Sequence, residues 1–177
     1  SRIATLDTKD DHPARALGSV VLARADRTNL NTLADLAGKR VAAVAPEAFG
    51  GYLVAAREML DQGVDPESDL KEIQFVGLPM IRIIEAVQRG DVDAGIVRAC
   101  LPEQLARQGK IRFEDFRVLS GRLDPDLACA LSTRLYPNWP IAVTRQTDPV
   151  LAKAVARALL AMPESDGMSW SVPADYQ

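Results

Sequence analysis

Short apolar runs alternate with segments of helical periodicity along most of this chain. The runs expected as strands are Arg2–Leu6, Gly18–Arg24, Lys39–Ala45, Glu72–Val76, Asp93–Val97, Phe116–Ser120 and Ala128–Ser132. The segments expected as helices are Thr32–Leu36, Gly51–Asp61, Pro79–Arg89, Pro102–Gln108 and a last helix from Pro149 to about Met162. Strand–helix alternation with short loops predicts an α/β fold with a mainly parallel sheet.

Two of the helices have clear boundary signals. Helix Pro79–Arg89 carries apolar side chains at i, i+3, i+4 and i+7, which is the spacing of one helix face, and Gly90 follows as a stop signal. The last helix begins after Asp148, a residue type favoured as an N-cap, and has proline at its first position.

The composition is that of an ordinary globular protein. The 177 residues are 47% hydrophobic and 25% charged, enough for a real core. The net charge of −3 and the lack of a lysine and arginine cluster argue against nucleic-acid binding. No apolar run approaches the ~20 residues of a membrane span.

Two cysteines, Cys100 and Cys129, have neither CxxC spacing nor a nearby histidine. With one histidine in the chain, we expect no metal site. The favoured interpretation is a pair of buried, small hydrophobic side chains. A disulfide between them is the alternative if the compartment is oxidising.

The residues available for catalysis are few. His12, the only histidine, lies in a polar loop where a solvated side chain is expected. Asp91 and Asp93 follow a glycine and are typical of turn chemistry rather than of a catalytic carboxylate pair. The Gly38–Lys39 pair precedes its strand, so it is no P-loop. We therefore expect no catalytic residue and no cofactor.

The segment 38–52 is the first candidate binding element. A basic lead-in and an apolar run are followed by Phe49, Gly50 and Gly51 at the start of a helical pattern. A helix N-terminus presents backbone N–H groups and partial positive charge, which together favour an anion. Glycine also lets a ligand approach the backbone closely. The alternative is an ordinary strand–helix turn that binds nothing.

Arg98, Ser132 and Thr133 complete the candidate site. Arg98 falls at the carboxyl end of the strand 93–97, where open α/β sheets place ligand contacts, and a guanidinium grips an oxyanion in a bidentate manner. Ser132 and Thr133 follow another strand and offer hydroxyl donors, or else form a polar strand end. We expect Arg98 and the turn at 49–51 to face one cleft.

The chain resembles a known family at several segments. They are Gly-Lys-Arg-Val-Ala-Ala-Val-Ala-Pro-Glu-Ala-Phe-Gly-Gly (38–51), Gly-Asp-Val-Asp-Ala-Gly-Ile-Val-Arg (90–98), Ser-Thr-Arg-Leu-Tyr-Pro-Asn-Trp-Pro (132–140) and Trp-Ser-Val-Pro-Ala-Asp-Tyr-Gln (170–177). They are similar to phosphonate-binding-like periplasmic domains, above all to the sensor domains of tetrathionate-type two-component histidine kinases. The segment 90–95 is generic to periplasmic binding proteins, whereas 49–51 and 132–139 are more specific to the sensor branch.

The resemblance implies a type II periplasmic binding fold, with two α/β lobes joined by hinge strands and a ligand in the cleft. It assigns 1–24 to the end of lobe one and the first hinge crossing, 25–127 to lobe two, and 128–177 to the hinge return and the closing helix of lobe one. We expect the first part of lobe one to be missing from this sequence, which leaves mainly one lobe, the hinge strands and part of the other lobe.

The chain departs from the family's pattern at three places. Ala48 replaces a hydroxyl residue before the Phe-Gly-Gly turn, and Leu78 to Ile81 replace a polar pair. Cys100 stands where glycine is common. These changes leave the identity of the ligand open, and ligand binding itself with it.

The resemblance implies a periplasmic, non-catalytic sensor domain that binds a small sulfur or phosphorus oxyanion and belongs to a membrane-anchored histidine kinase. The alternative is the solute receptor of a phosphonate or oxyanion ABC importer. A small transferase-like α/β enzyme is a third class, disfavoured by the single loop histidine. If the missing lobe leaves hinge strands near 1–24 and 128–134 unpaired, self-association through them is expected.

Overall fold

The computed structural model describes residues 2–8, 16–125, 127–163 and 168–171. His12 lies outside these ranges, as do residues 172–177 of the segment 170–177 that carries part of the family resemblance. The chain divides into two compact units. The larger unit is 18–134, and the smaller unit combines 1–17 with 135–177.

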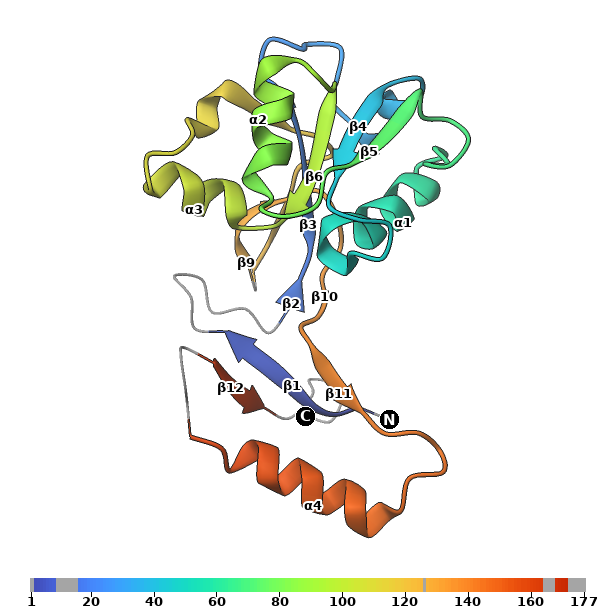
Figure 1. Ribbon diagram of the computed structural model, residues 1–177, viewed down its shortest axis with the longest axis vertical. Coiled ribbons are helices and arrows are strands. Elements are labelled where there is room, and N and C mark those ends of the chain that lie inside the picture. The colour runs from blue at the N-terminus through green and yellow to red at the C-terminus, as the bar shows by residue number, and fades with distance from the viewer. Residues whose placement is uncertain (1, 9–15, 126, 164–167, 172–177) are drawn as a thin grey trace. The chain divides into compact units, whose positions relative to one another are not determined.

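A five-stranded sheet forms the centre of the larger unit (Figure 1). Its order is β5 (Glu72–Phe75), β4 (Arg40–Ala43), β6 (Ala94–Arg98), β3 (Ser19–Arg24) and β7 (Phe116–Val118). Strand β4 is parallel to both β5 and β6, whereas β3 is antiparallel to β6 and β7. Four strands therefore run in one direction and β3 runs against them, so the expected mostly parallel sheet is confirmed.

Helices cover both faces of this sheet (Figure 1). One face packs on η1 (Leu33–Leu36) and α1 (Val54–Asp61), and the other on α2 (Ile81–Arg89) and α3 (Leu101–Arg107). Successive residues of β3 alternate between the two cores, as Val21 faces the first and Leu22 the second. Buried strands covered on both faces explain the continuous apolar runs in the sequence.

Glycine allows α2 to pack closely on β6. A Cβ at Gly95 would lie 2.6 Å from the Cγ2 of Ile83 and 2.9 Å from that of Val87. Gly90 ends α2 in the left-handed conformation, at φ 79°, as the stop signal predicted. Two features of the generic motif 90–95 are thus explained by packing and by the turn.

The remaining elements of the larger unit are short. They are η2 (Phe49–Leu53), η3 (Phe113–Asp115), β8 (Arg122–Asp124) and β9 (Leu127–Leu131). Strands β8 and β9 pair as an antiparallel ribbon. The sequence predicted β9 but not β8.

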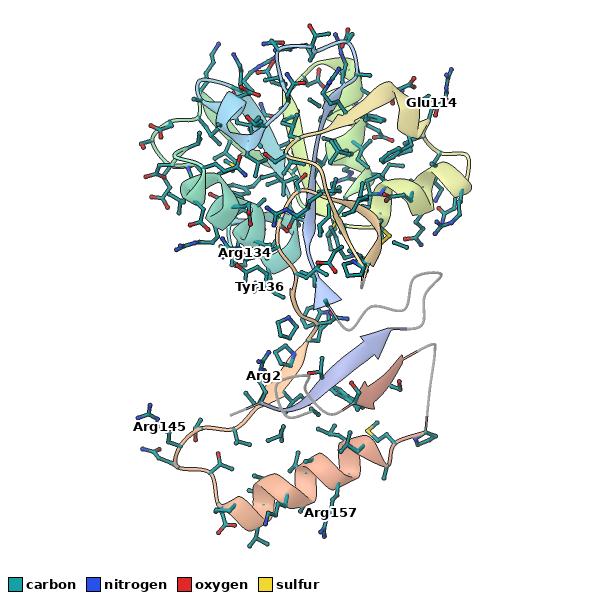
Figure 2. All side chains as sticks on the ribbon, turned by 180° about the vertical axis from the view of Figure 1, so that it is seen from behind. Arg2, Glu114, Arg134, Tyr136, Arg145 and Arg157 are labelled. Atoms are coloured by element: carbon teal, nitrogen blue, oxygen red, sulfur yellow. A yellow bond between two sulfur atoms is a disulfide. The ribbon has the colours of Figure 1, made fainter. Side chains whose placement is uncertain are left out.

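The smaller unit is built on antiparallel pairs. Strand β1 (Arg2–Thr8) lies between β11 (Pro140–Ala142) and β12 (Met168–Ser171), and β2 (Ala16–Leu17) pairs with β10 (Tyr136–Pro137). Helix α4 (Pro149–Leu160) lies against β1 and β12. Asp148 caps α4, because its Oδ1 accepts the N–H groups of Val150 at 2.7 Å and Leu151 at 3.1 Å. In Figure 2, Arg157 projects from the side of α4 away from the sheet.

The compact units meet at 17/18 and 134/135, whereas the expected lobe boundaries are 24/25 and 127/128, because β3 and β9 pack within the larger unit. The division into lobes stays a prediction. The expectation of unpaired hinge strands is wrong for β1 and β3, since each lies between two hydrogen-bonded partners.

Candidate functional site

The candidate residues of the larger unit lie at one end of the central sheet, where the parallel strands β4 and β6 have their carboxyl ends. This end is called the carboxyl edge below. Strands β4 and β6 are parallel neighbours, with Val41 opposite Ala94, so their carboxyl ends lie at the same edge. The chain leaving β4 enters η2 at Phe49, and β6 ends at Arg98. Because η2 also lies against β6, the turn at 49–51 and Arg98 share this edge. That they bind one ligand stays a prediction.

Ser19, at the start of β3, connects the candidate segments. Its Oγ donates to the carbonyl of Gly50 at 2.8 Å, and its N–H donates to Oγ1 of Thr133 at 3.0 Å. Its carbonyl accepts the N–H of Ser132 at 2.9 Å, and Arg98 is its register partner on β6. One fully buried serine thus ties together all the segments singled out from the sequence.

The turn at 49–51 is the first turn of a continuous helix rather than a loop before it. It has π geometry, in which the N–H of Leu53 donates to the carbonyl of Ala48 and that of Val54 to Phe49. The helix therefore begins two residues earlier than predicted. The first amides of a helix have no intrahelical acceptor, so this start suits an anion.

Gly51 is required by packing at this start. A Cβ there would lie 2.6 Å from Cγ2 of Val44 and 2.9 Å from its Cβ. The carbonyl of Gly51 also accepts the N–H of Val44 at 3.3 Å. Glycine lets η2 sit directly on the end of β4.

Arg98 differs from several other arginines of the larger unit. Arg27 and Arg40 both bind Asp93, and Arg134 binds Glu58. Within the described ranges, the half-buried guanidinium of Arg98 makes no hydrogen bond or ion pair. A cationic side chain at the carboxyl edge is therefore not neutralised by a carboxylate among these residues.

Ser132 and Thr133 are fully buried and bonded to the backbone. Oγ of Ser132 accepts the N–H of Val21 at 2.9 Å. Oγ1 of Thr133 accepts the N–H of Ser19 and donates to the carbonyl of Arg134 at 3.0 Å. Both hydroxyls hold the segment after β9 against β3, and their direct contact with a ligand stays a prediction.

A buried carboxylate, that of Glu58, anchors Arg134, the next residue of that segment. Glu58 on α1 accepts the N–H of Arg134 at 3.2 Å and the Nη2 of Arg122 at 3.1 Å. The guanidinium of Arg134 also binds Asp61. The side chain of Arg134 therefore forms ion pairs with two carboxylates of α1.

Apolar side chains lie at the carboxyl end of β5, which is at the same edge of the sheet because β5 is parallel to β4. The N–H of Gly77 donates to the carbonyl of Val44 at 2.9 Å. The next residue, Leu78, has 68% of its surface exposed. The rings of Tyr52 and Phe75 pack edge to face at 5.1 Å. Burial of Tyr52 raises the pKa of its hydroxyl, so the ring is neutral at physiological pH.

Cys100 and Cys129 form a disulfide, with their Cα atoms 5.1 Å apart. The favoured interpretation of two separate buried side chains is therefore wrong, and the alternative is correct. Residues 29 apart in sequence meet because α3 follows β6 while β9 passes beside β3. The sequence pattern alone contains no signal for this proximity.

Asp93 does more than form a turn, because its carboxylate connects two strands of the sheet through hydrogen bonds. Its carboxylate accepts the N–H of Arg40 and the guanidinium of Arg27, both at 2.9 Å. Burial by itself raises the pKa of Asp93, but these hydrogen bonds outweigh burial, so the pKa is lowered. This group holds β4 to the start of β6, at the sheet edge opposite Arg98.

Within the described part of the chain, no group of three histidine, cysteine or acidic side chains is placed to hold a metal ion. Nor is any described helix long and apolar enough to cross a membrane.

Sequence reasoning missed Ser19 and Glu58. Ser19 is one small polar residue before an apolar strand, and Glu58 breaks the apolar stripe of α1. A charged residue on the buried face of a predicted helix is a signal that could have indicated a partner.

The fold defines the class of this protein. XAC2383 from Xanthomonas citri, solved bound to ATP, aligns with a TM-score of 0.65 and 19% identity over 89% of this chain and 56% of its own. A binding-protein component of an ABC phosphonate transporter from Pseudomonas aeruginosa aligns with a TM-score of 0.60 and 14% identity over 95% of this chain and 57% of its own. These similarities show the fold, which is that of the type II periplasmic binding proteins.

The family follows from the sequence. Residues 3–172 match the model of the periplasmic substrate-binding protein of phosphonate ABC transporters. The chain therefore belongs to the phosphonate-binding family of periplasmic substrate-binding proteins.

Two curated relatives are longer proteins. The tetrathionate sensor histidine kinase TtrS of Salmonella typhimurium is 37% identical over 97% of this chain. The phosphate-import protein PhnD of Mycolicibacterium smegmatis is 34% identical over 49% of it. The aligned region spans 29% of the length of each relative.

Proposed function

We propose that this chain is the periplasmic ligand-binding region of a two-component sensor histidine kinase, and that it binds a small oxyanion. Arg98 carries the proposal. It is a half-buried arginine at the carboxyl end of a central strand, beside the start of η2, and it has no carboxylate partner among the described residues. A guanidinium and backbone amides at a helix start are the donor set that an oxyanion needs.

The relatives support the sensor role. TtrS is a tetrathionate sensor, and its similarity covers nearly the whole chain, whereas PhnD, a phosphate-import protein, matches about half. We therefore place sulfur oxyanions, tetrathionate among them, first in the ligand class and phosphorus oxyanions second. Ligand binding would bias a kinase elsewhere in a membrane-anchored protein by shifting a conformational equilibrium.

The test is Arg98→Ala in the full-length protein. Loss of a charged hydrogen-bond partner from a desolvated anion is expected to weaken binding by about 2–5 kcal/mol. Calorimetry would be run against sulfate, thiosulfate, tetrathionate, phosphate and methylphosphonate. Arg89→Ala is the matched control, because it removes an equal charge at the far end of α2, where Arg89 pairs with Asp91 at the surface. Unchanged affinity in a folded Arg98→Ala protein contradicts the assignment.

The receptor of an ABC importer is the second candidate, favoured by the family match itself. The complete gene decides between the two. A membrane span followed by a kinase domain supports the sensor, and a solitary binding protein encoded beside a permease supports the importer.

Self-association remains part of the proposal, although β1 and β3 are paired on both sides and cannot provide open edges. Light scattering at high concentration tests it, and a clean monomer would remove it.

A further inference from the structure

The Cys100–Cys129 disulfide joins the two segments that carry the candidate site. Cys100 lies two residues after Arg98, and Cys129 three residues before Ser132. Both segments then bond to the start of β3, since the N–H of Ala99 donates to the carbonyl of Gly18 at 3.0 Å and that of Ser132 to Ser19 at 2.9 Å. The covalent bond therefore closes a ring of contacts around the carboxyl edge.

Cys100 is held in an unfavourable backbone conformation. Its φ of 68° and ψ of −15° are left-handed, a region that disfavours residues with a Cβ. The bond to Cys129 restrains the residue in this conformation.

The carboxylate of half-buried Glu103, close in sequence to Cys100, has a hydrogen-bond partner at one oxygen only among the described residues. Oε1 of Glu103 accepts the N–H of Ala130, next to Cys129, at 2.7 Å. Its other oxygen, Oε2, is buried without a hydrogen-bond partner among the described residues. Glu103 also lies one helical turn after Cys100. A disulfide has no proton to donate, whereas a thiol is a donor, so reduction creates S–H donors close to this carboxylate.

We propose that Cys100–Cys129 is a redox-sensitive modification site whose state sets ligand affinity at the carboxyl edge; the inference rests on the proposed function for the position of the site. A small thiolate attacks Sγ of the half-buried Cys100, the S–S bond breaks, and nearly buried Cys129 leaves as a thiolate and is protonated. A second thiol releases Cys100. In total, two small thiols become one small disulfide, and their two protons end on the two protein thiols.

Reduction weakens binding in this mechanism. Once its sulfur is free, Cys100 leaves the left-handed region, and the backbone immediately after Arg98 moves with it. The expected loss of affinity is about tenfold, the factor that corresponds to the left-handed penalty of a residue with a Cβ.

Two double variants of the full-length protein test this cause. Cys100→Ser with Cys129→Ala removes the bond and keeps a Cβ at position 100. Cys100→Gly with Cys129→Ala removes the bond but permits the left-handed conformation at no steric cost. The two proteins differ at one residue only. Affinity for sulfate, methylphosphonate and inorganic phosphate, none of which reacts with the reductant, is measured with and without dithiothreitol.

The oxidised natural protein and the glycine variant are expected to bind equally well, and the serine variant about tenfold more weakly. Only the natural protein is expected to respond to dithiothreitol. Equal affinity of the serine and glycine variants, or no effect of the reductant on the natural protein, overturns the proposal.

Hydrogen exchange provides a readout that needs no ligand. The amides of Ser19 and Ala99 are expected to exchange faster after reduction and in the serine variant, but not in the glycine variant. Unchanged exchange overturns the proposal even if affinity falls. If no protein binds any of the three probes, calorimetry of the oxidised protein with thiosulfate and tetrathionate tests the proposed function, while the exchange comparison still decides whether the disulfide controls this edge.

Discussion

The two units differ in how they use apolar side chains. Among the described residues, all of the buried apolar side chains except Ala4 belong to the larger unit, 18–134. In the smaller unit, α4 has no buried residue, and Val150, Leu151 and Met162 each expose more than half of their surface. The larger unit is therefore stabilised by a core on each face of its sheet, and the smaller unit by strand pairing and a helix cap.

This difference bears on function. The candidate oxyanion residues lie in the larger unit, on an edge held by buried hydrogen bonds and a disulfide. A preformed edge of this kind keeps its donors in place before a ligand arrives, which lowers the cost of binding.

The largest expected effect tests the contrast in burial directly. Leu22→Ala removes a side chain that is 1% exposed and is expected to destabilise the larger unit by about 2–5 kcal/mol. Leu151→Ala makes the same chemical change on α4, where the side chain is 57% exposed, and is expected to change the free energy of unfolding by no more than about 0.5 kcal/mol. Urea unfolding followed by circular dichroism measures both. Similar losses would mean that α4 is buried in solution.

A smaller effect is expected where glycine permits close packing. In Gly95→Ala the new methyl group meets Ile83 and Val87 on α2, and the overpacking is expected to cost about 1–3 kcal/mol. Gly121→Ala is the control, because the nearest atom to its Cβ lies at 3.5 Å, an ordinary contact. If Gly95→Ala were as stable as the control in thermal unfolding, the β6–α2 interface would be looser than described.

The cap of α4 tests whether the smaller unit unfolds by itself. Asp148→Ala removes the acceptor of two helix amides and is expected to cost about 1 kcal/mol, whereas Asp148→Asn keeps an N-cap and should cost less. Hydrogen exchange should rise in α4 and stay unchanged in β4. A parallel rise in both would show that the units unfold together.

The smallest effect concerns acid stability of the larger unit. The folded-state pKa of Asp93 is lowered, so its stabilising contribution is present above the unfolded pKa, near 3.8, and is lost as the pH falls through the folded pKa. Asp93→Asn is expected to flatten the stability–pH curve below about pH 5. Asp91→Asn, at an exposed surface pair, is the control. Parallel curves for Asp93→Asn and the natural protein would remove Asp93 from the acid transition.

The main helices and the five-stranded sheet of the larger unit followed from local patterns, because the helices repeat apolar residues at the helical period and the buried strands are continuous apolar runs. The short strands β2, β8, β10, β11 and β12 did not, since these strands of two to four residues outside the central sheet have neither a continuous apolar run nor enough positions to show alternation. The Cys100–Cys129 disulfide could not be predicted either, because the separation of two cysteines in the sequence does not show whether their Cα atoms come close enough to bond.

The amino-acid sequence by itself determined the α/β class, the order of the main elements, the family, and the placement of Arg98 and the Phe-Gly-Gly turn after strands. Only the tertiary structure decided that β3 runs against its neighbours, that Cys100 meets Cys129, and that Ser19 bonds Thr133 across 114 residues. The physical reason is range. The apolar patterns of helices and strands depend on residues close together in the sequence, whereas contacts between distant segments depend on how the helices pack on the two faces of the sheet.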